Sequence, residues 1–285
     1  MDYSRISRFV NEQLDALEKG RCQRPDLYKA LEGAGYAISG RARKIREAAD
    51  SFGYMVYDGC PGRSKIFNPQ VVFVTDQHGF FDEAIAGMFS KFASQKVLGM
   101  EHVIAVEGGN GRLVRDKSEL QNDGSLVYTI EDAIGQKKFI AEKGGYLARL
   151  FPLIKKNGLF VDFSDNLEEA KRFVENYLKF NEARMNLFRT GINPKTSEEL
   201  RTRLNEYYEP LFKRSERFLN NHLYYTGQKF DTFQIYGIVD HLLGSVQRGL
   251  TNNRISYVGF VPRKISQDTG IEHMRKLFLA LASRR

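Results

Sequence analysis

The chain has 285 residues, of which 42% are hydrophobic and 27% charged, and its formal net charge is +8. These values are ordinary for a globular protein with a sizeable core, and the positive charge favours a polyanionic partner. No apolar run approaches the roughly 18 residues that a membrane span needs, and the first residues lack the pattern of a signal peptide. Two cysteines are too few for a disulfide framework or a four-thiolate metal site. We expect a cytoplasmic protein without membrane contact, metal or other cofactor.

The first 67 residues predict three helices followed by a hairpin. Apolar residues at helical spacing predict helices over 4–18, 25–33 and 39–52. Ser39 is a favourable N-cap for the third helix. The strand-like runs YMVY and SKIF flank the turn DGCPGR, and this pattern predicts a β-hairpin over 54–67. The inner stripe of the third helix is expected to be Ile45, Ala48, Ala49 and Phe52.

The remaining residues predict a mixed α/β segment followed by a mainly helical C-terminal part, so the predicted fold class is α+β. A boundary after Asn68-Pro69 divides the chain into expected domains 1–74 and 75–285. In the α/β segment we expect strands over 71–74, 103–107, 125–130 and 158–163, and helices over 80–98 and 131–156. In the C-terminal part we expect helices over 165–188, 196–222, 232–248 and 270–284, and a strand over 254–261. Thr196 with Glu199 is a capping-box pattern that predicts the start of the helix over 196–222. Pro210 lies within this helix and is expected to bend it.

Three short helices followed by a basic hairpin resemble a winged helix-turn-helix domain. The resemblance covers residues 4–74 and rests on the order of the elements and on the pairing of a basic helix with a basic hairpin, without a signature motif. It implies that the helix over 39–52 enters the major groove of duplex DNA. It also implies that the hairpin over 54–67 lies on the DNA backbone or in the minor groove.

Basic side chains are the expected DNA contacts, because Lys and Arg neutralise phosphates and Arg also bonds guanine. The candidate residues are Arg41, Arg43, Lys44 and Arg46 on the third helix, Arg63 and Lys65 in the hairpin, and Arg24 and Lys29 around the second helix. A run of basic residues is also typical of an ordinary solvated helix face, and Glu47 and Asp50 partly offset its charge here. This second interpretation stays open.

Catalytic patterns in the sequence are weak, and we expect no catalytic residue. The sequence lacks a phosphate-binding P-loop, and its five histidines form no metal-ligand pair. Asp76 and His78 lie two positions apart at the end of a predicted strand, and Asp240 stands beside His241. A hydrogen-bonded or exposed histidine is the preferred interpretation of both pairs. Carboxylates near predicted strands are Glu107, Glu142 and Asp162, and Glu142 with Lys143 would face opposite sides of a strand.

The first hypothesis is a DNA-binding transcription regulator, or an accessory factor in replication or recombination, that binds double-stranded DNA as a homodimer. Aromatic-rich amphipathic stretches at 182–194 and 207–227 are expected to pack mainly in the core, and the long amphipathic helices of the C-terminal part are also a candidate dimer interface. One alternative is a metal-dependent nuclease with its active site in residues 75–165, delivered to DNA by the winged helix. The other is an interaction factor whose winged helix binds a protein partner.

Overall fold

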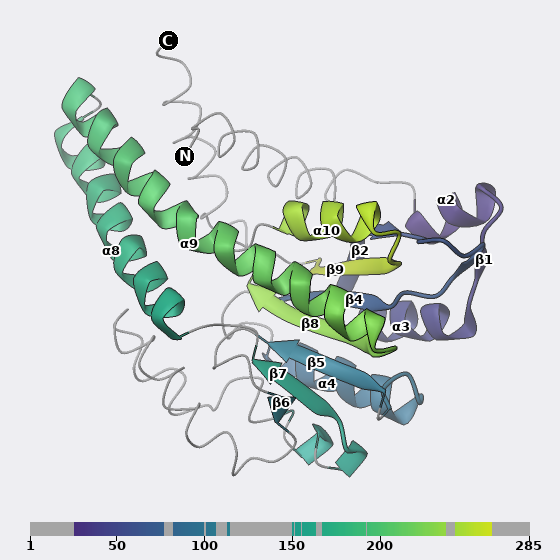
Figure 1. The fold of residues 1–285 in the computed structure, drawn as a ribbon. Coiled ribbons are helices and arrows are strands. Elements are labelled where there is room, and N and C mark those ends of the chain that lie inside the picture. The colour runs from purple at the N-terminus through teal and green to yellow at the C-terminus, as the bar shows by residue number, and fades with distance from the viewer. Residues whose placement is uncertain are drawn as a thin grey trace.

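The computed structural model describes residues 26–76, 82–99, 101–106, 113–114, 150, 152–154, 156–163, 167–191, 193–237 and 243–263. These residues form a seven-stranded sheet with helices on both faces, together with a small two-stranded sheet (Figure 1). The expected mixture of helices and strands is confirmed. The helices predicted over 4–18 and 270–284, the strand over 125–130 and most of the helix over 131–156 lie outside the described residues.

The central strands of the large sheet are all parallel, and an antiparallel strand lies at each edge. From one edge to the other, the order is β2 (Tyr54–Cys60), β9 (Tyr257–Pro262), β4 (Val71–Asp76), β8 (Asp231–Gly237), β5 (His102–Val106), β7 (Phe160–Phe163) and β6 (Leu113–Val114). β4, β5, β7 and β9 confirm four predicted strands.

The strands β4, β5 and β9 read as nearly continuous apolar runs because both of their faces are buried. In β4, Val72 and Val74 pack into the core cluster on one face of the sheet. Val71 and Phe73 pack into the cluster on the other face. The sheet is therefore the middle layer of a three-layer α/β/α arrangement.

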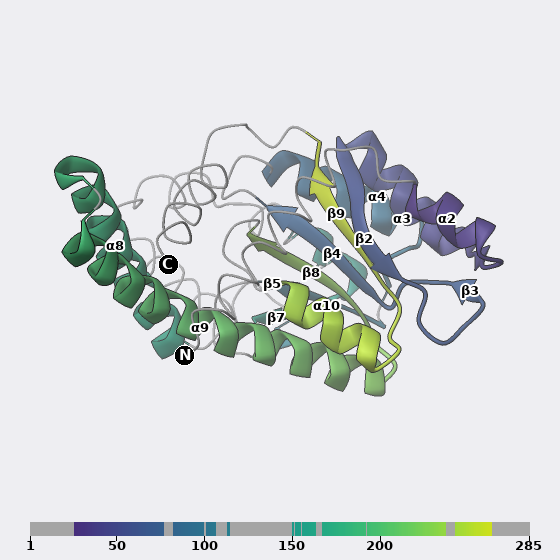
Figure 2. The same cartoon turned by 90° about the horizontal axis from the view of Figure 1, so that it is seen from above.

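Helices from different parts of the chain cover the two faces (Figure 2). The first face carries α2 (Leu27–Gly33), α3 (Gly40–Ser51) and α4 (Asp82–Ser94), and the second carries α9 (Pro194–Gly227) and α10 (Leu243–Asn252). α8 (Leu167–Thr190) packs along α9, and together they form an arm that extends beyond the sheet (Figure 1).

The start and the inner face of α3 agree with the prediction. The Ser39 hydroxyl accepts a hydrogen bond from the Ala42 amide at 3.0 Å, so Ser39 is the N-cap. Ala42, Ile45, Ala48 and Ala49 are fully buried against α4 and β2. The predicted stripe of α3 is thus confirmed, with Phe52 partly buried at its end.

The capping box of α9 differs from the prediction. Asn193, and not Thr196, is the N-cap residue. Thr196 occupies the third helical position, and its hydroxyl accepts a hydrogen bond from the Asn193 amide at 3.0 Å. The helix therefore begins at Pro194, where a missing N–H costs nothing. Pro210 lies inside this helix and is buried.

The predicted hairpin over 54–67 is wrong. β2 pairs with β9 in the large sheet, whereas β3 (Ile66–Phe67) pairs in parallel with β1 (Ala37–Ile38) in the small one. The Pro61-Gly62 turn was a valid turn signal, but a local signal cannot reveal a partner strand from the other end of the chain. The expected domain boundary between residues 74 and 75 falls inside β4, and strands from both sides of it share one sheet.

The predicted helix over 232–248 is wrong in its first part, which forms β8, and right in its last residues, which belong to α10 from Leu243 onward. Thr232 to Ile235 are buried on both faces of the central strand. Phe233 and Ile235 alternate with Thr232 and Gln234, which is the pattern of a strand, but the alternation is short and the apolar residues that follow it continue into α10.

Candidate nucleic-acid interface

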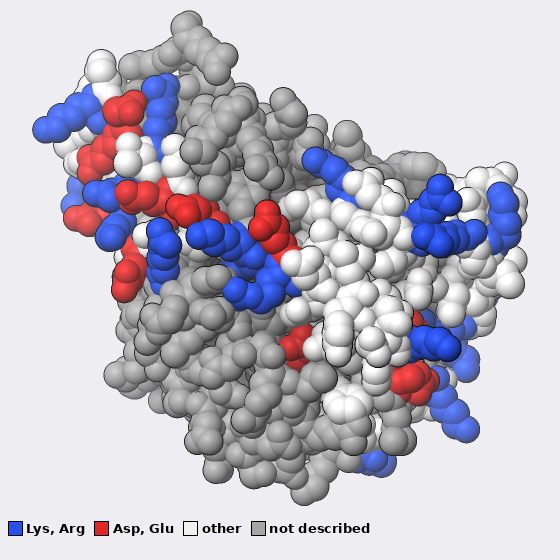
Figure 3. All heavy atoms as spheres, viewed as in Figure 1, with Lys and Arg blue, Asp and Glu red and all other residues white. Residues whose placement is uncertain are grey.

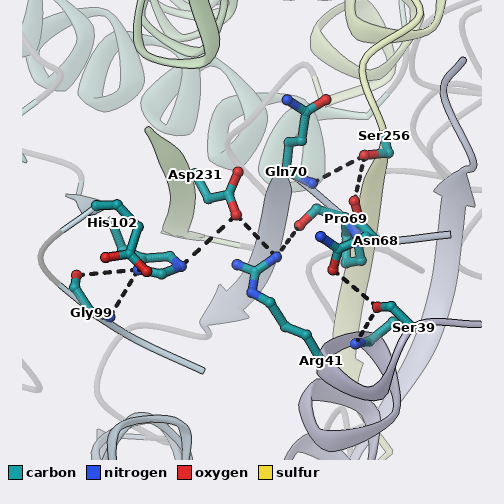
Figure 4. A network of polar contacts seen from close by, with 11 residues as sticks. Ser39, Arg41, Asn68, Pro69, Gln70, Gly99, His102, Asp231 and Ser256 are labelled. Atoms are coloured by element: carbon teal, nitrogen blue, oxygen red, sulfur yellow. Dashed lines mark hydrogen bonds and ion pairs between the residues drawn. The ribbon is translucent and has the colours of Figure 1, made fainter. Parts of the chain in front are cut away.

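Arg41, the first basic residue of α3, belongs to the interior of the fold (Figure 4). Its Nη1 lies 3.1 Å from the Asp231 carboxylate and donates to the Pro69 carbonyl at 2.6 Å. The guanidinium also lies 5.7 Å from the ring centre of Phe233. Burial lowers the pKa of Arg41 and raises that of Asp231, and each partner's charge opposes that effect on the other. Arg41 thus joins α3 to the amino end of β8.

His102 extends this network at the same edge of the sheet. Its Nδ1 accepts a hydrogen bond from the Gly99 amide at 2.8 Å, and its Nε2 lies 3.8 Å from the Asp231 carboxylate. Burial, followed by the charge of Arg41, lowers the pKa of His102. The neutral ring with its proton on Nε2 fits both contacts. These contacts hold α3 and the loop before β5 against the amino end of β8, so we interpret this network as structural.

The other basic residues of α3 also have partners within the fold. Arg43 lies 3.1 Å from Glu32, and both side chains are exposed. Arg46 pairs with Asp26, and its guanidinium lies 5.0 Å from the ring centre of Tyr28. Carboxylates of the same molecule therefore neutralise much of the positive face predicted for this helix.

Lys44 donates to the Gln95 carbonyl at 3.2 Å, at the C-terminal end of α4. Its side chain remains exposed, and its contact is with a neutral group. Lys44 is thus the one residue among the four candidates of α3 whose charge faces no carboxylate in the described part of the chain.

Four other cations gather at the end of the sheet where β2 ends and β9 begins, and they form what we call the basic end. Arg63 follows the turn after β2, and Arg254 follows α10. Lys65 holds its Nζ 4.6 Å from the ring centre of Tyr36, and Lys29 is exposed on the adjoining α2. Figure 3 shows Lys and Arg side chains over α2 and beside α10 with no Asp or Glu among them on that face. Of the predicted contacts, Lys29, Arg63 and Lys65 thus lie at one end.

A close approach of two backbone segments creates the basic end. A Cβ at Gly62 would lie 2.9 Å from the Ser256 amide and 3.0 Å from the Arg254 carbonyl, so only glycine fits there. The φ of Gly62 is +73°, which also favours glycine. A Cβ at Gly59 would touch the Leu27 side chain, which shows how closely α2 packs on β2.

Carboxylates near the basic end are held by other groups. Asp26 and Glu32 pair with the arginines of α3. Asp58 accepts hydrogen bonds from the Tyr257 hydroxyl at 3.2 Å and from the Gly59 amide at 2.9 Å. The predicted contact Arg24 lies outside the described residues. Sequence reasoning missed Arg254, because only the pairing of β2 with β9 brings it beside Arg63.

The carboxyl edge of the sheet carries the acidic candidates. Asp76, the last residue of β4, lies beside Gly237, the last residue of β8. After β4 the chain goes to α4 on one face, and after β8 it goes to α10 on the other, so this is the switch point where open α/β sheets bind ligands. The candidates Glu107, His78, Asp240 and His241, and the pair Glu142 and Lys143, lie outside the described residues.

Asp162, the remaining acidic candidate, is buried under α9. It accepts a hydrogen bond from the Asn221 side chain at 3.2 Å. Burial, followed by the charge of Asp162, raises the pKa of Tyr225. These contacts fix β7 to α9. Within the described ranges, no three acidic, histidine or cysteine side chains are close enough to hold a metal ion.

None of the helices in the described part of the chain combines the length and the apolarity needed to cross a membrane. Comparisons with models of known families, with curated proteins and with solved structures found no significant match to this chain. The function must therefore be argued from its own surfaces.

Proposed function

We propose that the chain binds double-stranded DNA through the basic end formed by Lys29, Arg63, Lys65 and Arg254. The observation that carries the proposal is the convergence of these exposed cations from three separate segments, while the neighbouring carboxylates face other partners. Such a surface gains affinity by releasing the counterions condensed on the phosphates. Transcription regulation, or an accessory role in replication or recombination, is the corresponding biological class.

The proposal retains the partner implied by the winged-helix resemblance and changes the surface that binds it. Arg41, Arg43 and Arg46 have carboxylate partners, so contact with DNA would first have to break those pairs. Arg63 and Lys65, which the resemblance assigned to the wing, contact DNA in this proposal from a turn beside α10. Lys44 remains available for a further phosphate contact.

The test is fluorescence anisotropy with a random-sequence duplex between about 50 and 200 mM salt, where a surface that neutralises several phosphates loses affinity steeply. We expect the combined change Arg63→Glu and Arg254→Glu to reduce affinity by at least about tenfold and to flatten the salt dependence. Lys195→Glu with Lys213→Glu, at two exposed lysines of α9, is the control with the same change in net charge. Equal losses in both variants would show that overall charge, and not the basic end, determines binding.

The pair Arg43→Ala and Arg46→Ala separates the basic end from α3. If α3 enters the major groove, this variant loses most of its affinity for DNA. If the basic end binds the phosphates, it keeps most of it, because both arginines are already paired with Glu32 and Asp26.

A second candidate function is a DNA-processing enzyme that uses the carboxyl edge. The observation that favours it is the register of β4 and β8, which places Asp76 at the switch point. In sequence, His78 follows the end of β4 by two positions, and Asp240 and His241 follow the end of β8 by three and four. The test is cleavage of plasmid DNA with Mg²⁺ or Mn²⁺, compared with Asp76→Asn and Asp240→Asn. Cleavage that persists in both variants, or none in the wild type, would reject this candidate.

A further inference from the structure

One face of α8 is already fully used by α9. The ring of Phe180 stacks on Tyr207 with 5.3 Å between the ring centres. The Asn176 side chain donates to the Glu206 carbonyl at 2.7 Å. Ala183 is buried on the same face, as is Leu187 one turn later. These residues recur at spacings of three and four, as expected for a helix with one packed stripe.

The opposite face of α8 is apolar as well. Leu178 and Met185 are each 42% exposed, which makes them two of the few large apolar side chains exposed in the described residues. At about 100° per residue, both lie on the side of the helix directed away from α9. Within the described ranges α8 packs along α9, and α9 does not cover Leu178 or Met185, which therefore form a second apolar stripe on α8.

The charges beside this stripe indicate what covers it. Glu175 and Arg189 are both exposed and lie fourteen positions apart on α8. An antiparallel second copy of α8 places Glu175 opposite the partner's Arg189, and Leu178 opposite the partner's Met185. Both pairings are centred within one residue of Glu182, so a single two-fold axis satisfies them together. A parallel copy would place each charge against its own kind.

The arm also has the shape that such a partner requires. A groove of about 530 Å³ lies next to Met185, lined by Lys179, Glu182 and Arg189 of α8 and by Glu199 and Arg203 of α9. Figure 1 shows the arm extending past the sheet, which leaves this side of α8 clear of the described helices on the sheet. Glu182 falls near the axis, where Lys179 of each copy lies within one turn.

We propose that the chain forms a two-fold symmetric dimer through the outward face of α8, with the two helices antiparallel. The interface is isologous, so Leu178 of each copy meets Met185 of the other across the axis. This places the expected homodimer contact on the stripe around Leu178 and Met185. It is independent of DNA binding, because it involves no residue of the basic end.

Sedimentation velocity of the full chain between about 1 and 100 µM tests the dimer, since dissociation depends on concentration. We expect a dimer for the wild type and a monomer for Leu178→Glu with Met185→Glu. Both side chains are already partly exposed, so circular dichroism should show an unchanged fold. Ile66→Glu is the control, because this residue is 54% exposed at the other end of the molecule, and it should remain dimeric. A monomeric wild type at the highest concentration would overturn the proposal.

Charge reversal tests the antiparallel arrangement separately. Glu175→Arg alone and Arg189→Glu alone should each weaken the dimer, by about tenfold or more, because each puts two like charges together on both sides of the axis. The double variant restores opposite charges and should return the dissociation constant toward that of the wild type. Failure of the double variant to recover would reject this geometry.

Discussion

Arg41 shows how a residue that reads as a DNA contact can serve the fold instead. In sequence it is the first of four cations on a helix, and nothing local distinguishes it from Arg43. In the structure its side chain is only 19% exposed and reaches Asp231, which lies 190 positions later in the chain. The charge is retained in a partly desolvated site, which is costly unless a partner of opposite charge is present.

We expect Arg41→Met to destabilise the protein by about 3 kcal/mol, because it leaves the Asp231 carboxylate partly buried without its cation. The combination with Asp231→Asn should recover a large part of this loss. Urea denaturation of both variants measures the effect. Equal stability of Arg41→Met and the wild type would show that the pair is not buried in solution.

His222 makes stability depend on pH. It is fully buried in α9, its Nδ1 lies 2.8 Å from the Thr232 hydroxyl, and burial lowers its pKa to about 3. An unfolded histidine has a pKa of about 6.5, so between pH 6.5 and 3 only the unfolded chain binds this proton. His222 therefore contributes stability above pH 6.5 that is lost as the pH falls toward 3.

Across this window, His222 should reduce the unfolding free energy by up to about 1.4 kcal/mol for each unit of falling pH. His222→Gln should remove this part of the dependence. The measurement is urea denaturation of both proteins at several values from pH 7 to 4. Parallel curves for the two proteins would show that this site does not exclude the proton.

At the scale of elements, the sequence predicts an element well where residues close to it in sequence determine its structure. Ser39 starts α3, and its stripe of Ile45, Ala48 and Ala49 packs inward, because capping and helical spacing are properties of nearby residues. The partner of β2 and the structure of β8 are predicted wrongly for the opposite reason. The partner strands of both come from distant parts of the chain, and the short alternation of Phe233 and Ile235 with polar residues does not show that both faces of β8 are buried.

The basic end was also predicted only as far as local sequence allows. Lys29, Arg63 and Lys65 were predicted as contacts from their charge alone, but Arg254 was not. Its place beside Arg63 depends on the close approach at Gly62, which no sequence pattern reveals. The neutralisation of α3 by Asp26, Glu32 and Asp231 was equally hidden, although Glu32 lies only eleven positions from Arg43.

Two glycines near the basic end should respond in opposite ways to alanine. Gly62→Ala places a Cβ against backbone atoms of the Arg254–Ser256 segment at a positive φ, so we expect a loss of more than about 1 kcal/mol. Gly33→Ala, at the end of α2, meets no atom within 4 Å and should be neutral or stabilising by up to about 1 kcal/mol. Thermal denaturation compares the two. A Gly62→Ala protein as stable as the wild type would contradict the packing of the turn against that segment.

At the scale of the whole molecule, elements from both ends of the described chain share a core cluster. Tyr28 of α2, Phe67 of β3 and Phe260 of β9 belong to the same buried cluster as the helix α4. Composition correctly indicated a chain able to build a large core. The division into an N-terminal and a C-terminal domain rested on the order of predicted elements, and order alone does not determine which strands pair.

A fragment of residues 1–74 tests this connectivity directly. We expect it to remain unfolded, because β2 would lack β9 and α3 would lack α4. Heteronuclear NMR of the fragment should therefore show poorly dispersed amide signals. A well-dispersed spectrum with cooperative thermal unfolding would instead indicate an independent domain, as the winged-helix resemblance implies.

Because β9 lies between β2 and β4, β2 cannot pair in the large sheet until β9 has been synthesised. Asp58 and its partner Tyr257 are 199 residues apart, and a ribosome adding about 5 to 20 residues per second needs roughly 10 to 40 s to cover that distance. Throughout this interval the nascent chain carries the YMVYDGC segment without its neighbour in the sheet. Premature termination anywhere before Tyr257 would leave that segment exposed, so truncated products should be ready substrates for chaperones and proteases.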